Sequence, residues 1–211
     1  LFESCASGGA RFDPGMLHYA PQAWTSDDTD AVERIKIQYG TSYVYPLSSM
    51  GSHVSVVPNH QVFRNTPLHT RANVAYFGTF GYELDLSKMT DEEKKMAGEQ
   101  IAFFKEHGRL FQFGDYYRLT SPFENRDYTV WEYAAQDGSE ACMSVVYTDM
   151  YANAASEIVK WKGLDPKKVY QMQLDGEDAG NFSGAALMHA GILLPLPEQN
   201  YDAFQIYLKA E

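Results

Sequence analysis

Three aspartates, Asp27, Asp28 and Asp30, lie close together in the segment "PQAWTSDDTDAVERIKIQYG", and carboxylates so placed serve either as helix caps or as acid/base groups. Asp30 precedes an amphipathic run and has Glu33 three residues later, so we expect a capping box in which Glu33 reaches back. Asp27 and Asp28 follow a short segment that reads as the end of a strand. In a β/α barrel that is the usual place of a catalytic carboxylate, and the alternative is a solvated loop acid. The residues themselves leave both interpretations open.

The segment "CASGG" is a second candidate, because small residues let a ligand approach backbone N–H groups closely. Its spacing matches neither GxxxxGK[ST] nor GxGxxG, so a phosphate site is not supported. Taken alone, Cys5 is expected to be a buried small hydrophobe. His53 and His60 could be acid/base groups, but no third residue is seen to orient them, and we expect ordinary hydrogen-bond partners beside turns.

Composition limits the class of protein. The chain has 211 residues, 45% apolar and 21% charged, which is typical of a globular protein. Its formal net charge of -11 opposes binding to nucleic acid or to an anionic membrane. The two cysteines, Cys5 and Cys142, show neither disulfide nor zinc spacing, and no apolar run is long enough to span a bilayer. We expect a cytoplasmic protein without metal or other cofactor, whose sequence begins without a targeting segment.

The pattern of residue types changes once along the chain. Residues 1–113 alternate short extended runs with amphipathic ones, and the clearest helix is "TDEEKKMAGEQIAFFKEHG", with Thr90 and Glu93 as a capping box and Gly108 as its stop. Residues 114–211 contain short aromatic and β-branched runs separated by turns, such as "QDGS" with Gly138 at a position that tolerates positive φ. The sequence therefore predicts a β/α domain followed by an antiparallel β domain.

Several long segments are informative as exact sequences and not only through their pattern of polar and apolar residues. They are "ESCASGGARFDPGMLHYAPQAWTSDDTDAVERIKIQYG", "TPLHTRANVAYFGTFGYELDL", "GLDPKKVY" and "FSGAALMHAGILLPLP". Together they resemble the bacterial α-galactosidases of glycoside hydrolase family 36. The resemblance extends from residue 1 to residue 211 and implies the C-terminal portion of a longer enzyme.

The resemblance implies a fold of class α/β plus β: the C-terminal half of a (β/α)8 TIM barrel, about strand 5 to helix 8, in residues 1–113, and an antiparallel β-sandwich-like domain in residues 114–211. The barrel strands would be "ESCASGG", "APQAW", "SYVYPLSS" and "NVAYFGTF".

The resemblance also implies a function and a set of site residues. Members of the family cleave terminal α-1,6-linked galactose from melibiose and raffinose-type oligosaccharides with retention of configuration, using two aspartates. Asp27 matches the acid/base position, and many relatives carry Asn where this chain has Asp28. Cys5 and Gly8 would contact the galactose near C2, and Trp24 is a candidate wall of the site. The implied partners are the N-terminal remainder of the enzyme and further copies in a homo-oligomer.

The family's nucleophile lies in a motif of the type Lys-Trp-Asp-Met-Asn-Arg, which the 211 residues do not contain. This chain therefore carries the acid/base half of the site, and we expect the isolated polypeptide to be inactive. Two alternatives remain open: a transglycosylase of the raffinose or stachyose synthase type, and a non-catalytic carbohydrate-binding or assembly fragment.

Overall fold

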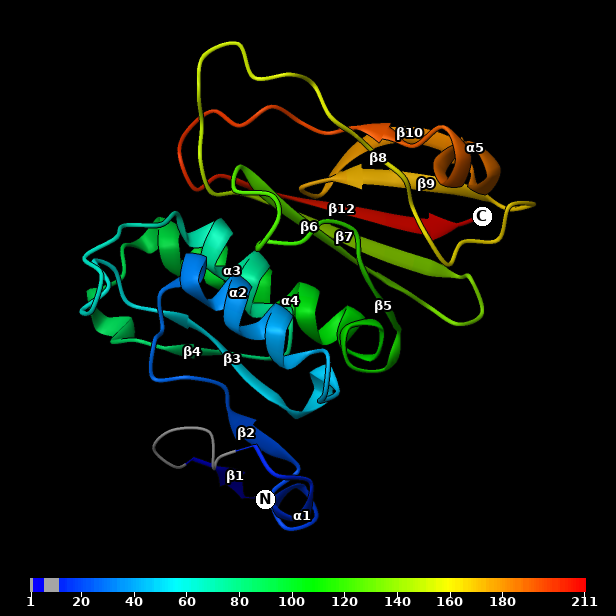
Figure 1. Cartoon of the computed structure of the whole chain (residues 1–211). Helices are drawn as coiled ribbons and strands as arrows, with labels where there is room; N and C mark the ends of the chain where they lie inside the picture. The colour runs from blue at the N-terminus through cyan, green and yellow to red at the C-terminus, as the bar shows by residue number, and fades with distance from the viewer. Residues whose placement is uncertain (1, 6–11) are drawn as a thin grey trace. The chain divides into compact units, whose positions relative to one another are not determined.

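The computed structural model describes residues 2–5 and 12–211, and the chain divides into two compact units, residues 1–112 and 113–211. Figure 1 labels the helices and strands of both. In the described part of the chain, every helix is too short or too polar to cross a membrane.

The first unit is built on a four-stranded parallel sheet in the order β1-β2-β3-β4. Its elements are β1 (Glu3–Ser4), α1 (Pro14–Leu17), β2 (Gln22–Trp24), α2 (Ala31–Thr41), the 3-10 helix η2 (Leu47–Ser49), β3 (Met50–Ser55), α3 (Leu68–Ala75), β4 (Thr79–Glu83), η3 (Leu86–Lys88) and α4 (Asp91–Phe113). Strands alternate with helices, as the sequence predicts for a β/α domain, because parallel neighbours need a crossover connection.

All residues of β3 are buried except His53. Met50, Ser52 and Val54 are fully buried. Helices α2 and α3 contact β3 and cover one face of its sheet (Figure 1). His53 lies between Ser52 and Val54 in sequence and is only partly buried, on the opposite face. On the covered face, Gln38 of α2 joins three elements: its Nε2 donates to the Val74 carbonyl at 3.0 Å, and its Oε1 accepts from the Ser52 hydroxyl at 2.7 Å.

Two of the expected barrel strands are wrong in their bounds. The segment 42–49 was expected to be extended, but it forms a turn and η2, and the strand begins at Met50. Pro46 lies inside that segment and offers no N–H to a ladder. The segment 73–80 was also expected to be a strand, yet its first residues complete α3 and only Thr79 and Phe80 belong to β4. The turn between them needs Gly78, because a Cβ there would lie 2.4 Å from the Met50 carbonyl oxygen.

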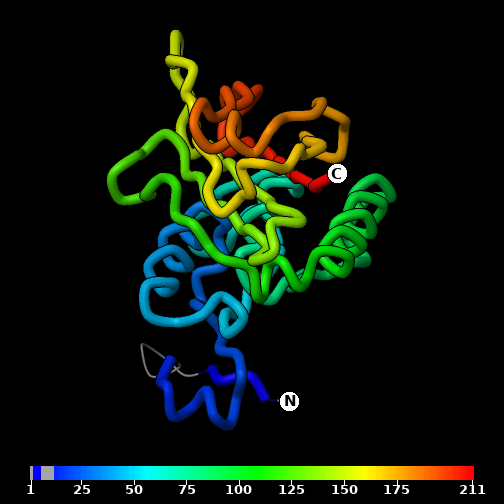
Figure 2. The backbone as a smooth tube through the Cα atoms, turned by 90° about the vertical axis from the view of Figure 1, so that its right-hand side faces the viewer, coloured from blue at the N-terminus to red at the C-terminus, as the bar shows by residue number. Residues whose placement is uncertain are grey.

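Helix α4, green in Figure 2, begins with the capping box that the sequence predicts. The Glu93 N–H donates to the Thr90 hydroxyl at 3.1 Å, and the Thr90 N–H donates to the Glu93 carboxylate at 2.8 Å. The prediction that Gly108 ends this helix is wrong, because the helix continues to Phe113. Leu110 and Phe111 are buried one turn further on, and their burial favours the longer helix over a glycine stop.

The second unit contains antiparallel sheets, as expected for its sequence. Its elements are β5 (Asp115–Arg118), β6 (Tyr128–Ala134), β7 (Glu140–Tyr147), β8 (Ile158–Val159), β9 (Val169–Leu174), β10 (Glu177–Ser183), α5 (Gly184–His189), β11 (Ile192–Leu193) and β12 (Ala203–Ala210). Six strands form one sheet in the order β10-β9-β12-β7-β6-β5, and β11 pairs with β8. Trp161 and Tyr170 lie in the core, and Gly138 takes the predicted positive φ of 63°.

Glu132 on β6 is a fully buried carboxyl, and both of its oxygens accept from the Lys162 backbone N–H, at 2.9 and 3.2 Å. Burial raises its pKa to about 8, although the Lys162 N–H and charge oppose the rise. The unfolded chain, with a pKa near 4.5, loses this proton first. The stability that the protonated group contributes is therefore complete below pH 4.5 and is lost as pH rises through 8.

We expect Glu132→Gln to remove this pH dependence, because the amide keeps the acceptor oxygen and cannot ionise. As the pH is raised from 5 to 8, the thermal midpoint of the wild type should decrease relative to that of the variant. The exposed Glu177→Gln variant is the matched control and should follow the wild type. If the thermal midpoints of Glu132→Gln and the wild type changed with pH in the same way, the prediction would be contradicted.

Candidate active site

The candidate residues lie at the carboxyl edge of the parallel sheet. Ser4 of β1 pairs with Ala23 of β2, so Cys5 and Trp24 each come next along adjacent parallel strands. Asp27 follows in the loop after β2 and is exposed. Cys5 is exposed too, so its interpretation as a buried small hydrophobe is wrong. Gly8, the remaining candidate, lies outside the described residues.

Trp24 is supported from β3 by a histidine. The rings of Trp24 and His53 lie 4.3 Å apart at 34°, and the Arg34 guanidinium carbon lies 5.6 Å from the centre of the Trp24 ring. Burial, and then the Arg34 charge, lower the pKa of His53 to about 4. Its imidazole is therefore neutral at pH 7 and a weak base. His53 sits within a strand rather than beside a turn, where it supports Trp24.

The loop after β2 is held by hydrogen bonds from Arg34, a residue of α2 that is only 3% exposed. Its Nε donates to the Asp28 carbonyl at 2.6 Å, and its two terminal nitrogens donate to the carbonyls of Ser26 at 2.7 Å and Gly51 at 3.2 Å. The Thr25 hydroxyl donates to the same Gly51 carbonyl at 2.6 Å. The end of β2 and its loop are thus joined to the first turn of α2 and to β3.

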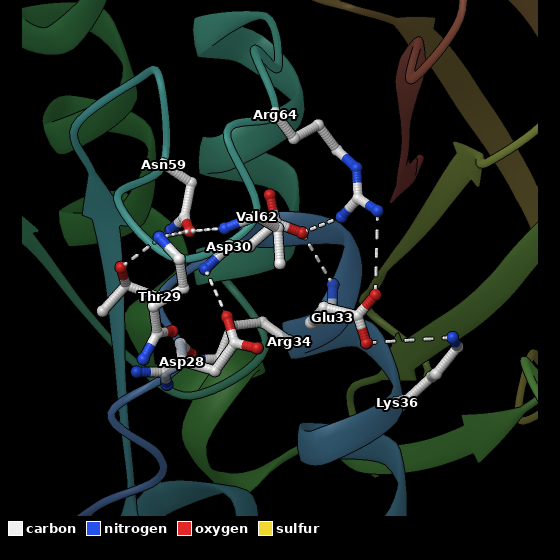
Figure 3. Close-up of polar contacts among 10 residues, drawn as sticks. Asp28, Thr29, Asp30, Glu33, Arg34, Lys36, Asn59, Val62 and Arg64 are labelled. Atoms are coloured by element: carbon white, nitrogen blue, oxygen red, sulfur yellow. Dashed lines mark hydrogen bonds and ion pairs between the residues drawn. The ribbon is translucent and has the colours of Figure 1, made fainter.

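Asp30 caps α2 as predicted, with its carboxylate accepting from the Glu33 N–H at 3.0 Å. It also pairs with Arg64, from the loop between β3 and α3 (Figure 3). Burial raises the pKa of Asp30, against the effects of the Glu33 N–H and Arg64. The expectation that Glu33 reaches back is wrong: its carboxylate lies 3.7 Å from Arg64 and 3.8 Å from Lys36, and the Asp30 N–H donates to Asp28. The nearby arginine attracts Glu33 away from the cap.

A second contact joins the same two loops. The Asn59 amide donates to the Thr29 hydroxyl at 3.2 Å, and its oxygen accepts from the N–H groups of Gln61 and Val62, as Figure 3 shows for Val62. Asn59 is 2% exposed. The segment that carries Asp27 is therefore supported by Arg34 from α2 and by Asn59 from the loop after β3.

Sequence reasoning missed Arg34, Arg64 and Asn59. One signal was available for Arg34, which falls on the apolar stripe of a helix with Ala31 and Ile35, where a charged residue needs buried partners. Nothing local in the sequence joins Arg64 to Asp30, since 34 residues separate them. An exposed carboxylate on a fixed loop, at the carboxyl edge of a parallel sheet, can donate a proton to a bound ligand and take one back.

Comparison with known proteins gives matches along the whole chain. A family model described as Melibiase matches residues 1–114, and a model of the glycosyl hydrolase family 36 C-terminal domain matches residues 128–208. Alpha-galactosidase AgaA of Geobacillus stearothermophilus is 51% identical over 210 residues, which is 100% of this chain and 28% of that protein. Alpha-galactosidase Mel36A of Lactobacillus acidophilus is 44% identical over 210 residues, again 100% of this chain and 28% of that protein.

Solved structures agree with these matches. The crystal structure of AgaA superposes with a TM-score of 0.94, covering 100% of this chain and 29% of that one. A doubly substituted AgaA in complex with raffinose superposes with a TM-score of 0.93 at 50% identity, with the same coverage. The chain spans about 28% of the length of these two curated relatives.

Proposed function

The chain belongs to the melibiase family, glycoside hydrolase family 36, and on that basis we propose that it forms the acid/base half of a retaining α-galactosidase. In this proposal residues 1–113 are the C-terminal half of the (β/α)8 barrel and residues 114–211 the C-terminal β domain. The substrates are α-1,6-galactosides of the melibiose and raffinose type. One observation carries the proposal: Asp27 is an exposed carboxylate on the braced loop at the carboxyl edge of a four-stranded parallel sheet.

The chemistry divides between two carboxyl groups about 5 to 5.5 Å apart. Asp27 gives its proton to the glycosidic oxygen as the bond to the galactose C1 breaks, while a second carboxylate attacks that carbon and forms the covalent intermediate. Asp27, now ionised, then takes a proton from water as the water attacks C1 from the side that the leaving group left. Two inversions give net retention. The attacking carboxylate belongs to the family's nucleophile motif, so it comes from residues beyond these 211.

Three further residues of this chain would bind the galactose beside Asp27. Trp24, backed by His53, is a wall for the apolar face of the sugar, and Cys5 and Gly8 approach the galactose near C2. Raffinose is bound by the doubly substituted AgaA that this chain resembles, and that supports a raffinose-type substrate.

The test of the function is product analysis with the full-length enzyme that contains this chain. Incubation with raffinose should release galactose, and NMR should detect the α-anomer first, before mutarotation. With p-nitrophenyl α-galactoside as the donor, transfer of galactose to added sucrose to form raffinose, in place of release of galactose, would favour the synthase type of transglycosylase. Binding of raffinose without turnover would mean that the protein is a carbohydrate-binding module. Either result would overturn the proposal.

We expect galactose to protect Cys5 from alkylation in the full-length enzyme. Cys5 is exposed, whereas Cys142 is buried and burial raises the pKa of its thiol, so iodoacetamide should modify Cys5 and leave Cys142 unmodified. Peptide mass mapping gives the rate at each site, with glucose as the control sugar. Equal rates at Cys5 with galactose and with glucose would remove Cys5 from the sugar site.

A further inference from the structure

Three consecutive peptide groups around Asp27 are held by side-chain hydrogen bonds. The carbonyl before it, of Ser26, accepts from Arg34 at 2.7 Å, and the carbonyl after it, of Asp28, accepts from Arg34 at 2.6 Å. The amide between them, the Asp28 N–H, donates to the Ser26 hydroxyl at 3.1 Å. The backbone on both sides of Asp27 is therefore fixed, although the Asp27 side chain itself is exposed.

Arg34 is suited to this task by its position and its shape. It projects from the first turn of α2, and its planar fork presents several donors at fixed angles, so it can bind the loop carbonyls and the Gly51 carbonyl of β3 together. Burying a guanidinium is costly unless its N–H groups are paired, so the fork holds these three carbonyls in one arrangement.

We propose that Arg34 is the positioning residue of the acid/base group, acting through the backbone on either side of Asp27. The inference rests on the proposed function, since it requires Asp27 to be the group that transfers the proton. Proton donation depends on placement, and a displacement of about 1 Å can cost about 10²-fold in rate. If Arg34 only stabilises the loop, replacing it should lower the fraction of folded enzyme. If Arg34 positions Asp27, replacing it should also lower the rate of proton donation in the folded enzyme.

The test is Arg34→Lys in the full-length enzyme, assayed as kcat/KM on raffinose and on 2,4-dinitrophenyl α-galactoside. Lysine keeps the charge and loses the fork, so the loop should shift while the helix remains. We expect raffinose hydrolysis to fall by about 10- to 100-fold, since its leaving group needs a proton. Dinitrophenolate departs without protonation, so the aryl substrate should lose less than about 3-fold.

Arg71 provides a matched control. It lies on α3, is 7% exposed, and donates to the carbonyl of Ser55, the last residue of β3, at 2.7 Å and to that of Thr66, in the loop after β3, at 3.2 Å. Arg71→Lys removes a comparable buried fork that does not hold the backbone around Asp27. It should lower activity on both substrates by the same factor, through the fraction of enzyme that is folded.

Two more variants make the result decisive. In an Asp27→Ala background, Arg34→Lys should lower raffinose hydrolysis no further, because the acid that it positions is gone. Ser26→Ala removes the acceptor of the Asp28 N–H and should give a smaller loss with the same dependence on the leaving group; it decides the matter if Arg34→Lys does not fold.

The outcomes separate this inference from the function on which it rests. If Asp27→Ala shows the leaving-group dependence but Arg34→Lys, or Ser26→Ala in its place, lowers both substrates equally or neither, Arg34 does not position the acid and the function stands. If Asp27→Ala itself affects both substrates equally, the acid/base assignment fails and the inference falls with it.

Discussion

Asp27→Ala in the full-length enzyme is expected to lower kcat/KM for raffinose by about 10²–10⁴-fold, the usual contribution of a positioned proton donor. The fructosyl-glucose leaving group needs a proton as its bond to galactose breaks, and Asp27 supplies it. Activated aryl galactosides should lose far less in the first step, because nitrophenolate leaves without a proton. Steady-state kinetics across aryl galactosides of graded leaving-group pKa measures the effect as a steeper dependence in the variant.

The adjacent residue provides the control. Asp28 accepts the Asp30 N–H at 3.1 Å, and an asparagine oxygen can accept the same bond. Asp28→Asn should therefore keep most of the activity on both substrates. The roles of the two residues would be reversed if Asp28→Asn showed the leaving-group dependence and Asp27→Ala did not.

Asp30→Ala is expected to cost about 3 kcal/mol of stability, well above the ~1 kcal/mol of a helix cap alone. Asp30 is 2% exposed and pairs with Arg64, whose side chain is 22% exposed. Removing the carboxylate leaves a largely buried guanidinium without this partner and the Glu33 N–H without its acceptor. The urea midpoint of the full-length enzyme, converted with the wild-type m-value, measures the loss.

Asp30→Asn separates the cap from the ion pair, because the amide oxygen still accepts the Glu33 N–H and carries no charge. It should lose more than ~1 kcal/mol and less than Asp30→Ala. Both variants should keep the wild-type ratio of activity on raffinose and aryl substrates. A loss confined to ~1 kcal/mol in Asp30→Ala would mean that Arg64 contributes nothing beyond the cap.

The parts of the fold that were predictable depend on local physics. Asp30 and Thr90 cap helices because their side chains reach N–H groups within three residues, and Gly138 turns a hairpin because its own φ is positive. The wrong strand bounds arose where tertiary contacts decide. Gly78 turns because of Met50, which lies 28 positions earlier. Pro46 was a local sign against a strand through residues 42–49, but nothing local shows that the strand starts at Met50.

The site was predictable to a different extent. Carboxyl chemistry and strand-end position left Asp27, Asp28 and an ordinary loop acid all open, and the resemblance to a family chose Asp27. The structure adds how the three aspartates differ: Asp30 is buried and paired, Asp28 accepts a backbone bond, and Asp27 is exposed. The contacts that brace them come from Arg34 and Arg64, and sequence spacing does not reveal which carbonyls or carboxylates a buried arginine will meet.

The central claim, that Asp27 is the acid/base group of a retaining enzyme, is tested most directly by azide. Full-length Asp27→Ala should still form the covalent intermediate from an activated aryl galactoside, but that intermediate should persist, because no base activates water. Azide needs no base, so it should restore turnover by attacking C1 from the face that water uses. Two inversions then give α-galactosyl azide, which the H1 coupling constant identifies. The β-azide would instead mean that the substitution removed the nucleophile, and absence of any azide product or rescue would mean that Asp27 is not the acid/base group.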